Sequence, residues 1–90
     1  MPIYKESILI DMLLQRNMEA FGLLYDIYAA AIYGIICKEI NNEEKTKKIL
    51  TNVFIRFSKQ LKNKDSIKEG LFVCLYKITN EMICNCKIDN

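Results

Sequence analysis

Apolar residues recur at helical spacing along almost the whole chain, and short polar stretches interrupt the pattern at three places. A period of three to four residues is typical of α-helices that bury one face. The pattern predicts helices over residues 6–14, 18–40 and 43–62, and a fourth helix that begins close to residue 70. Short connections between consecutive helices favour antiparallel neighbours. We therefore expect an all-α fold, a compact bundle of about four helices that forms a single domain over residues 1–90.

Polar residues mark the expected helix ends. Asn17 is expected to cap the second helix, because its side-chain oxygen can accept from the free amides of the first turn. Asn41-Asn42 breaks the pattern, and Glu43-Glu44 then falls in the first turn of the third helix, where carboxylates complement the helix dipole. The stretch from Lys62 to Gly70 is expected to be a loop, with Asp65-Ser66 or Gly70 as the start signal of the last helix.

The expected second helix carries two apolar stripes. One stripe follows positions 21, 24, 28, 31, 32 and 35, and the other runs through Leu23, Ile27, Ala30, Gly34 and Cys37. A helix that is apolar nearly all round belongs in the centre of a bundle or in an interface. Cys37 and Cys74 are expected to be small buried apolar residues.

The expected third helix has an apolar face and a basic face. The predicted buried residues are Ile49, Leu50, Val53, Phe54, Phe57 and Leu61, and the predicted outer residues are Lys45, Lys48, Asn52, Arg56 and Lys59. Residues 43–64 hold seven basic and two acidic side chains, a net charge of +5, whereas the whole chain carries +2. This concentration indicates either a solvated lysine face or a surface for an acidic partner or a nucleic acid backbone.

The composition excludes most enzymatic chemistry. The chain has no His, and its three glycines are isolated, so it lacks histidine-based catalytic groups and a phosphate-binding loop. Cys84 and Cys86 are two positions apart, which places them on different faces of a helix and suits a metal site poorly. We expect that the protein is not an enzyme and binds no metal or cofactor. We expect the four cysteines to have structural roles.

The location of the protein is predicted from what its sequence lacks. The longest uncharged stretch is the 11 residues from Ile27 to Cys37, well below the roughly 20 that span a bilayer. The first residues lack the basic and apolar pattern of a secretory signal. These features predict a cytoplasmic protein without a membrane segment.

Three motifs resemble region 2 of the extracytoplasmic-function sigma factors, a group within the sigma-70 family. Ala20-Phe21 followed by Leu24-Tyr25-Asp26-Ile27-Tyr28 is similar to the opening pattern of that region. Val53-Phe54-Ile55-Arg56 matches its Val-Phe-x-Arg segment, and Leu75-Tyr76-Lys77-Ile78 is similar to its Trp-Leu-aromatic-x-Ile segment. Helix number, order and length agree with the family from about residue 6 to residue 88.

The resemblance implies a transcription-initiation module that binds core RNA polymerase at the clamp helices of the β′ subunit and contacts the promoter −10 element. The residues that it implies at the polymerase are Lys47, Lys48, Thr51, Asn52 and Arg56. The residues that it implies at the DNA are Lys62, Lys64, Tyr76, Lys77, Asn80, Glu81, Asn85 and Lys87. An anti-sigma protein is a further partner that the resemblance implies.

The chain departs from the family at functional positions. Lys48, Thr51 and Asn52 stand where the family has Asp, Gln and Glu, and Ser58 and Cys74 stand where it has Trp. A lysine in place of an acid reverses the sign of any contact with a basic clamp surface. One alternative is therefore a sigma-like protein-interaction module without promoter activity, whose apolar second helix offers a face for a homodimer. The other is a small helical domain unrelated to the family.

Overall fold

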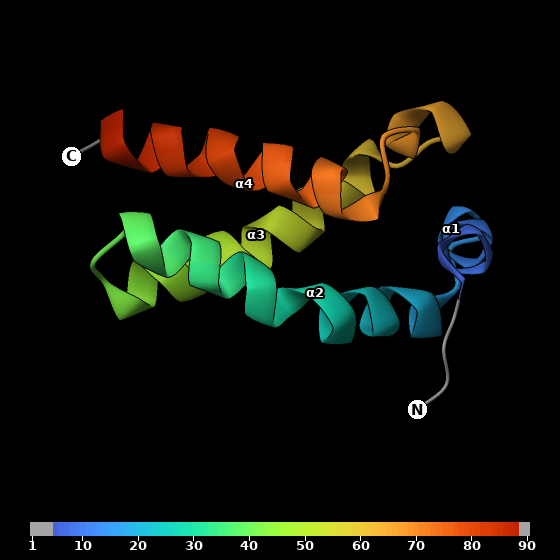
Figure 1. Cartoon of the computed structure of the whole chain (residues 1–90), viewed down its shortest axis with the longest axis horizontal. Helices are drawn as coiled ribbons and strands as arrows, with labels where there is room; N and C mark the ends of the chain where they lie inside the picture. Colours follow the sequence, from blue (N-terminus) through green and yellow to red (C-terminus); the bar gives the residue numbers. More distant parts are fainter. Residues whose placement is uncertain (1–4, 89–90) are drawn as a thin grey trace.

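Helices joined by short turns account for nearly all of the chain (Figure 1). The computed structural model describes residues 5–88, and over these residues it contains α1 (Glu6–Leu14), α2 (Met18–Glu39), α3 (Glu43–Gln60), η1 (Lys64–Ile67) and α4 (Leu71–Ile88). The prediction of an all-α bundle of four helices is confirmed. The boundaries also agree closely, although α3 ends two residues before the expected position.

Two asparagines cap the long helices. The side chain of Asn17 accepts a hydrogen bond from the Glu19 amide at 2.9 Å, as predicted. The side chain of Asn42 accepts from the Lys45 amide at 2.9 Å. Each cap satisfies an amide that has no partner inside its helix, so the chain starts α2 and α3 at positions its local sequence specifies.

The connection between α3 and α4 is more ordered than the expected loop. It contains η1, a short 3₁₀ helix whose Asn63 and Ser66 cap each other's backbone amides. Ile67, the last residue of η1, is buried in the core. Gly70 then adopts a φ of +102° immediately before α4, so Gly70, rather than Asp65-Ser66, marks the start of the last helix.

Replacing Gly70 with alanine is expected to lower the free energy of unfolding by about 1 kcal/mol or more, because a Cβ is strained at positive φ. Gly34 provides the matched control, since a Cβ there meets nothing within 4 Å. Gly34→Ala is expected to stabilise the protein by about 0.5–1 kcal/mol through helix propensity. Urea denaturation of both variants checks this, and a change of the same sign in both would contradict it.

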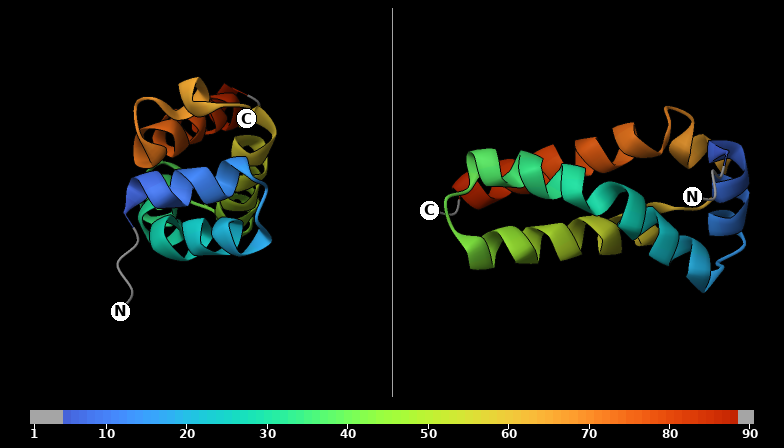
Figure 2. Two further views of the ribbon diagram at one scale, coloured as in Figure 1. Left: turned by 90° about the vertical axis from the view of Figure 1, so that its right-hand side faces the viewer. Right: turned by 60° about the horizontal axis from the view of Figure 1, so that its bottom comes forward.

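Three helices run along the long axis of the molecule, and α1 lies across one end (Figure 2). α2 and α3 form an antiparallel hairpin, and α4 packs on both of them. Lys87 near the end of α4 pairs with Glu39 at the end of α2, and this contact lowers the pKa of the Glu39 carboxyl. The three long helices, α2, α3 and α4, therefore pack together as a bundle, and α1 covers one end of this bundle.

Arg16 joins the turn between α1 and α2 to the C-terminal end of α3. Its Nη1 donates to the carbonyl oxygen of Ser58 at 2.9 Å and to the Ser58 hydroxyl at 3.2 Å. Its Nη2 donates to the carbonyl oxygen of Leu61 at 2.7 Å. Carbonyls at a helix end lack partners within the helix, so the guanidinium completes the end of α3. Arg16 also has a φ of +60°, in the left-handed region.

The core is one apolar cluster to which α1, α2, α3, η1 and α4 all contribute. The predicted buried face of α3 is confirmed for Ile49, Leu50, Val53, Phe57 and Leu61. Phe54 is only half-buried, and its ring lies 5.0 Å from that of Tyr25. Thr46 is buried, although it was predicted on neither the apolar nor the basic face of this helix. Its hydroxyl donates to the Asn42 carbonyl at 2.9 Å.

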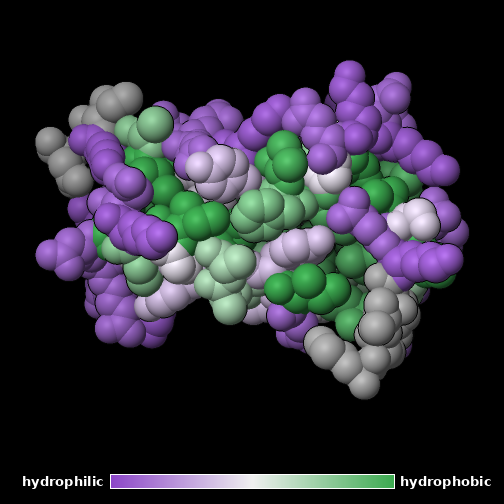
Figure 3. Space-filling view, viewed as in Figure 1, coloured by the Kyte–Doolittle hydropathy of each residue, from purple (hydrophilic) through white to green (hydrophobic). Residues whose placement is uncertain are grey.

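Most of the second apolar stripe of α2 faces solvent, although Leu23 is half-buried against the core, so a central position of α2, one of the two alternatives predicted, was wrong. Ile27 is 48% exposed, and Ala30, Gly34 and Cys37 are exposed as well, which also corrects the prediction that Cys37 is buried. The reason is that α3 and α4 pack on the opposite side of α2, where Leu24, Ile32 and Ile36 are buried. Figure 3 shows apolar surface along the face formed by α2 and α4. The other interpretation of α2 from the sequence, an interface with a partner, stays a prediction.

Within residues 5–88, α2 is also the one helix that meets the length and composition of a membrane span, with a mean hydropathy of 1.7. Core helices of soluble proteins meet the same criterion. The absence of a membrane segment therefore stays a prediction.

Candidate docking groove

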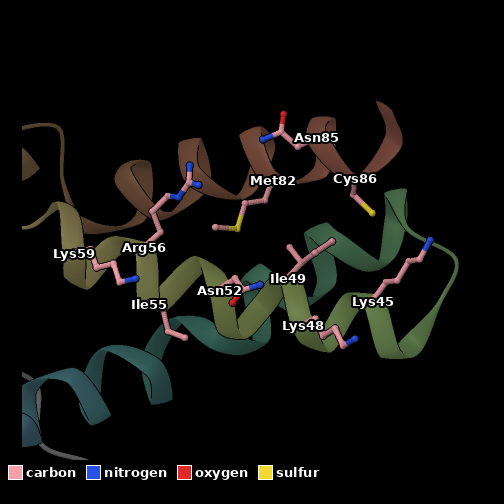
Figure 4. A pocket seen from close by; sticks show the side chains of 10 residues that line it. All are labelled: Lys45, Lys48, Ile49, Asn52, Ile55, Arg56, Lys59, Met82, Asn85 and Cys86. Atoms are coloured by element: carbon pink, nitrogen blue, oxygen red, sulfur yellow. The ribbon is translucent and has the colours of Figure 1, made fainter. Parts of the chain in front are cut away.

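An open groove of about 650 Å³ lies between α3 and α4 (Figure 4). We call it the α3–α4 groove, and its lining residues are Lys45, Lys48, Ile49, Asn52, Ile55, Arg56 and Lys59 of α3 with Met82, Asn85 and Cys86 of α4. Residues three and four positions apart are neighbours on a helix surface. The α3 members follow this spacing, so one side of α3 forms a wall along the groove.

The floor of the groove is apolar. Ile49 is buried, and Met82 and Cys86 are half-buried where α4 crosses α3. In Figure 4 the side chains of Ile49 and Met82 point into the space between the two helices. A partner that covers this floor therefore gains from burying apolar surface.

The rim of the groove is basic. Lys45, Lys48, Arg56 and Lys59 supply four cations, and none of the ten lining residues is acidic. Arg56 donates to the Glu81 carboxylate at 3.2 Å and so links α3 to α4. Among residues 5–88, neither Lys48 nor Lys59 forms an ion pair. The groove therefore keeps a net positive charge beside an apolar floor.

The five residues implied at the polymerase lie together on α3. Lys47, Lys48, Thr51 and Asn52 line one shallow hollow, and Lys48 and Asn52 also line the α3–α4 groove with Arg56. Lys47 pairs with Glu43 one turn earlier at 3.1 Å, which raises the pKa of Lys47. The hollow and the groove adjoin at Lys48 and Asn52, so the five residues are neighbours around α3, with Lys47 and Arg56 on opposite sides of the set.

The residues implied at the DNA do not form one surface. Lys62 and Lys64 lie in the connection after α3, and the others lie around the solvent side of α4. Glu81 and Asn85 face α3, since Glu81 contacts Arg56 and Asn85 lines the groove. Tyr76 instead stacks on Phe72 with ring centroids 6.0 Å apart, and Phe72 in turn approaches Tyr28 of α2.

Most of the lysines in this second set already have carboxylate partners. Lys64 lies 3.8 Å from Asp11, Lys77 pairs with Glu69, and Lys87 pairs with Glu39. The hydrogen bond and the charge of Lys77 lower the pKa of the Glu69 carboxyl, which favours its charged form. Asn80 and Lys62 are exposed without such a pair among residues 5–88.

Sequence reasoning missed part of the groove. Lys45 and Lys59 were predicted on the outer face of α3 but not among the functional residues, and no functional role was predicted for Met82 or Cys86. The helical spacing of the outer residues of α3 did indicate the α3 side of the groove. The crossing of α4 over α3 decides which α4 residues form the floor, and this crossing depends on tertiary packing.

The cysteines differ in their surroundings. Cys37 and Cys84 are exposed, whereas Cys74 and Cys86 are half-buried. Burial raises the pKa of the Cys74 thiol, which disfavours its thiolate form. Among residues 5–88, no group of three Cys, Asp or Glu side chains is arranged to hold a metal ion.

Comparison with known proteins leaves the family open. Searches against protein-family models, curated proteins and solved structures found no match to this chain. The resemblance to sigma region 2 therefore stays an expectation from the motifs, and the α3–α4 groove is the feature on which a functional proposal can be built.

Proposed function

We propose that this protein is a divergent sigma region 2-like module that binds core RNA polymerase through α3 and contacts the promoter −10 element in transcription initiation. The observation that supports it is that four of the five implied polymerase residues line one hollow on α3, and that Arg56 lines the groove beside it. That surface borders a groove with an apolar floor, which is the anatomy of a protein-binding site.

Core RNA polymerase is expected to be retained at low salt by the immobilised protein. Asn52→Trp places a large ring in the α3–α4 groove and is expected to weaken this binding about tenfold, because it blocks the partner irrespective of charge. Gln15→Trp is the control, since Gln15 is exposed at the end of α1, away from the groove. Absence of retention would remove the polymerase from the proposal.

A protein-interaction module without promoter activity is the second candidate. It is favoured by the dispersal of the implied DNA residues around α4 and by the carboxylate partners of Lys64, Lys77 and Lys87. Single-stranded DNA binding instead uses a continuous basic track with exposed aromatic rings. A polymerase complex that never opens a promoter with a fluorescent base in the −10 element would favour this second candidate.

A further inference from the structure

The α3–α4 groove has the length of a single docked helix. Lys45 and Lys59 lie at its two ends and are 14 positions apart on α3. This separation corresponds to about 21 Å at the helical rise of about 1.5 Å per residue. A partner helix of about four turns therefore matches the groove from end to end.

The floor specifies an apolar edge on the occupant. Ile49 and Met82 project between the helices, and Ile55 is 47% exposed on the same wall. An amphipathic helix presents apolar side chains at positions i, i+3 or i+4, and i+7, which is the pattern that such grooves bind. The unbranched Met82 side chain adapts to different apolar anchors.

The rim specifies the charge of the occupant. Lys48 and Lys59 have no ion-pair partner among residues 5–88, and the nearby Glu81 already accepts from Arg56. Carboxylates on the flank of a docked helix that faces α3 would meet these cations, whereas lysines there would be repelled. A nucleic acid backbone would satisfy the cations, but its phosphates offer no apolar edge to cover Ile49 and Met82.

We propose that the α3–α4 groove binds an acidic amphipathic helix of a partner protein. Apolar residues of the partner pack on Ile49 and Met82, and its carboxylates pair with Lys48 and Lys59. This proposal rests on the proposed function only in assuming that a protein binds at α3. It adds the charge and the helical form of the segment that binds. It predicts that the partner surface is acidic, opposite in sign to the basic surface that the family's acidic residue would meet.

Two fluorescent peptides of about four helical turns test the proposal. Both carry leucines at i, i+4, i+7 and i+11; one has glutamates at the flanking positions and the other has lysines. Anisotropy titrations with the full chain are expected to show binding of the glutamate peptide about tenfold tighter than that of the lysine peptide. The affinity of the glutamate peptide is expected to fall as salt rises.

Charge reversal locates the bound peptide. The double substitution Lys48→Glu with Lys59→Glu is expected to weaken the glutamate peptide at least about tenfold and to strengthen the lysine peptide. Lys38→Glu with Lys68→Glu is the control, because it changes the net charge equally at exposed sites outside the groove. Circular dichroism melts confirm that both variants are folded, and Met82→Ala tests the floor without a change of charge.

The outcomes separate this inference from the proposed function. Failure of the glutamate peptide to bind, or equal losses in the groove and control variants, would overturn the inference. A single-stranded oligonucleotide that binds more tightly and is lost in the groove variant would overturn it in favour of a nucleic acid. Binding of the glutamate peptide without retention of the polymerase would support the inference and contradict the proposed function. Retention of the polymerase without binding of the glutamate peptide would support the proposed function and overturn the inference.

Discussion

Replacing Phe57 with alanine is expected to lower the free energy of unfolding by about 4 kcal/mol, because it removes a buried ring and leaves a cavity. Phe57 is 2% exposed and is the largest of the fully buried side chains. Domains have a stability of roughly 0.05–0.15 kcal/mol per residue, so the loss is at least about 30% of the total for a chain of this size. Urea denaturation measures it as a large fall in the midpoint.

Ile55 supplies the control for this substitution. It lies two positions away on the same helix but is 47% exposed. Ile55→Ala is expected to change the free energy of unfolding by less than about 1 kcal/mol, since little apolar surface is removed from the core. Losses of similar size in the two variants would show that Phe57 does not lie at the centre of the bundle.

Arg16→Ala is expected to have the second largest effect, a loss of about 2–3 kcal/mol, because it removes the donors that complete the end of α3. Those donors bond the Ser58 carbonyl and hydroxyl and the Leu61 carbonyl. The guanidinium carbon also lies 5.9 Å from the centroid of the Phe21 ring. Thermal and urea denaturation both report this loss.

The backbone of Arg16 separates two contributions. Arg16→Gly removes the same hydrogen bonds but relieves the φ of +60°, which non-glycine residues adopt at a cost. Arg16→Gly is therefore expected to be more stable than Arg16→Ala and less stable than the original protein. Equal stability of all three proteins would show that Arg16 does not hold the end of α3.

The parts of the fold that local chemistry determines were predictable from the sequence. Asn17 marks the start of α2 through a hydrogen bond that spans two residues, and Gly70 marks the start of α4 through its own backbone conformation. The buried face of α3 followed from apolar residues at helical spacing, with Phe57 at its centre. These features depend on residues within one or two helical turns of each other, so they can be predicted from a single sequence.

The parts that depend on distant segments were not predictable. Arg16 contacts Ser58 and Leu61, which lie 42 and 45 positions further along the chain, and no sequence motif predicts such contacts. The two stripes of α2 are equally apolar in the sequence, and only the packing of α3 and α4 decides that Ile27 is exposed. The candidate site was half predictable: Lys48 and Asn52 belong to a visible helix face, but Met82 joins them only after α4 crosses α3.

The exposed stripe of α2 is also expected to affect how copies of the protein interact in solution. Ile27 and Ala30 expose apolar side chains to water beside the exposed Gly34, and a net charge of +2 gives only weak long-range repulsion between copies. We therefore expect a low second virial coefficient that falls further as salt screens the repulsion between copies.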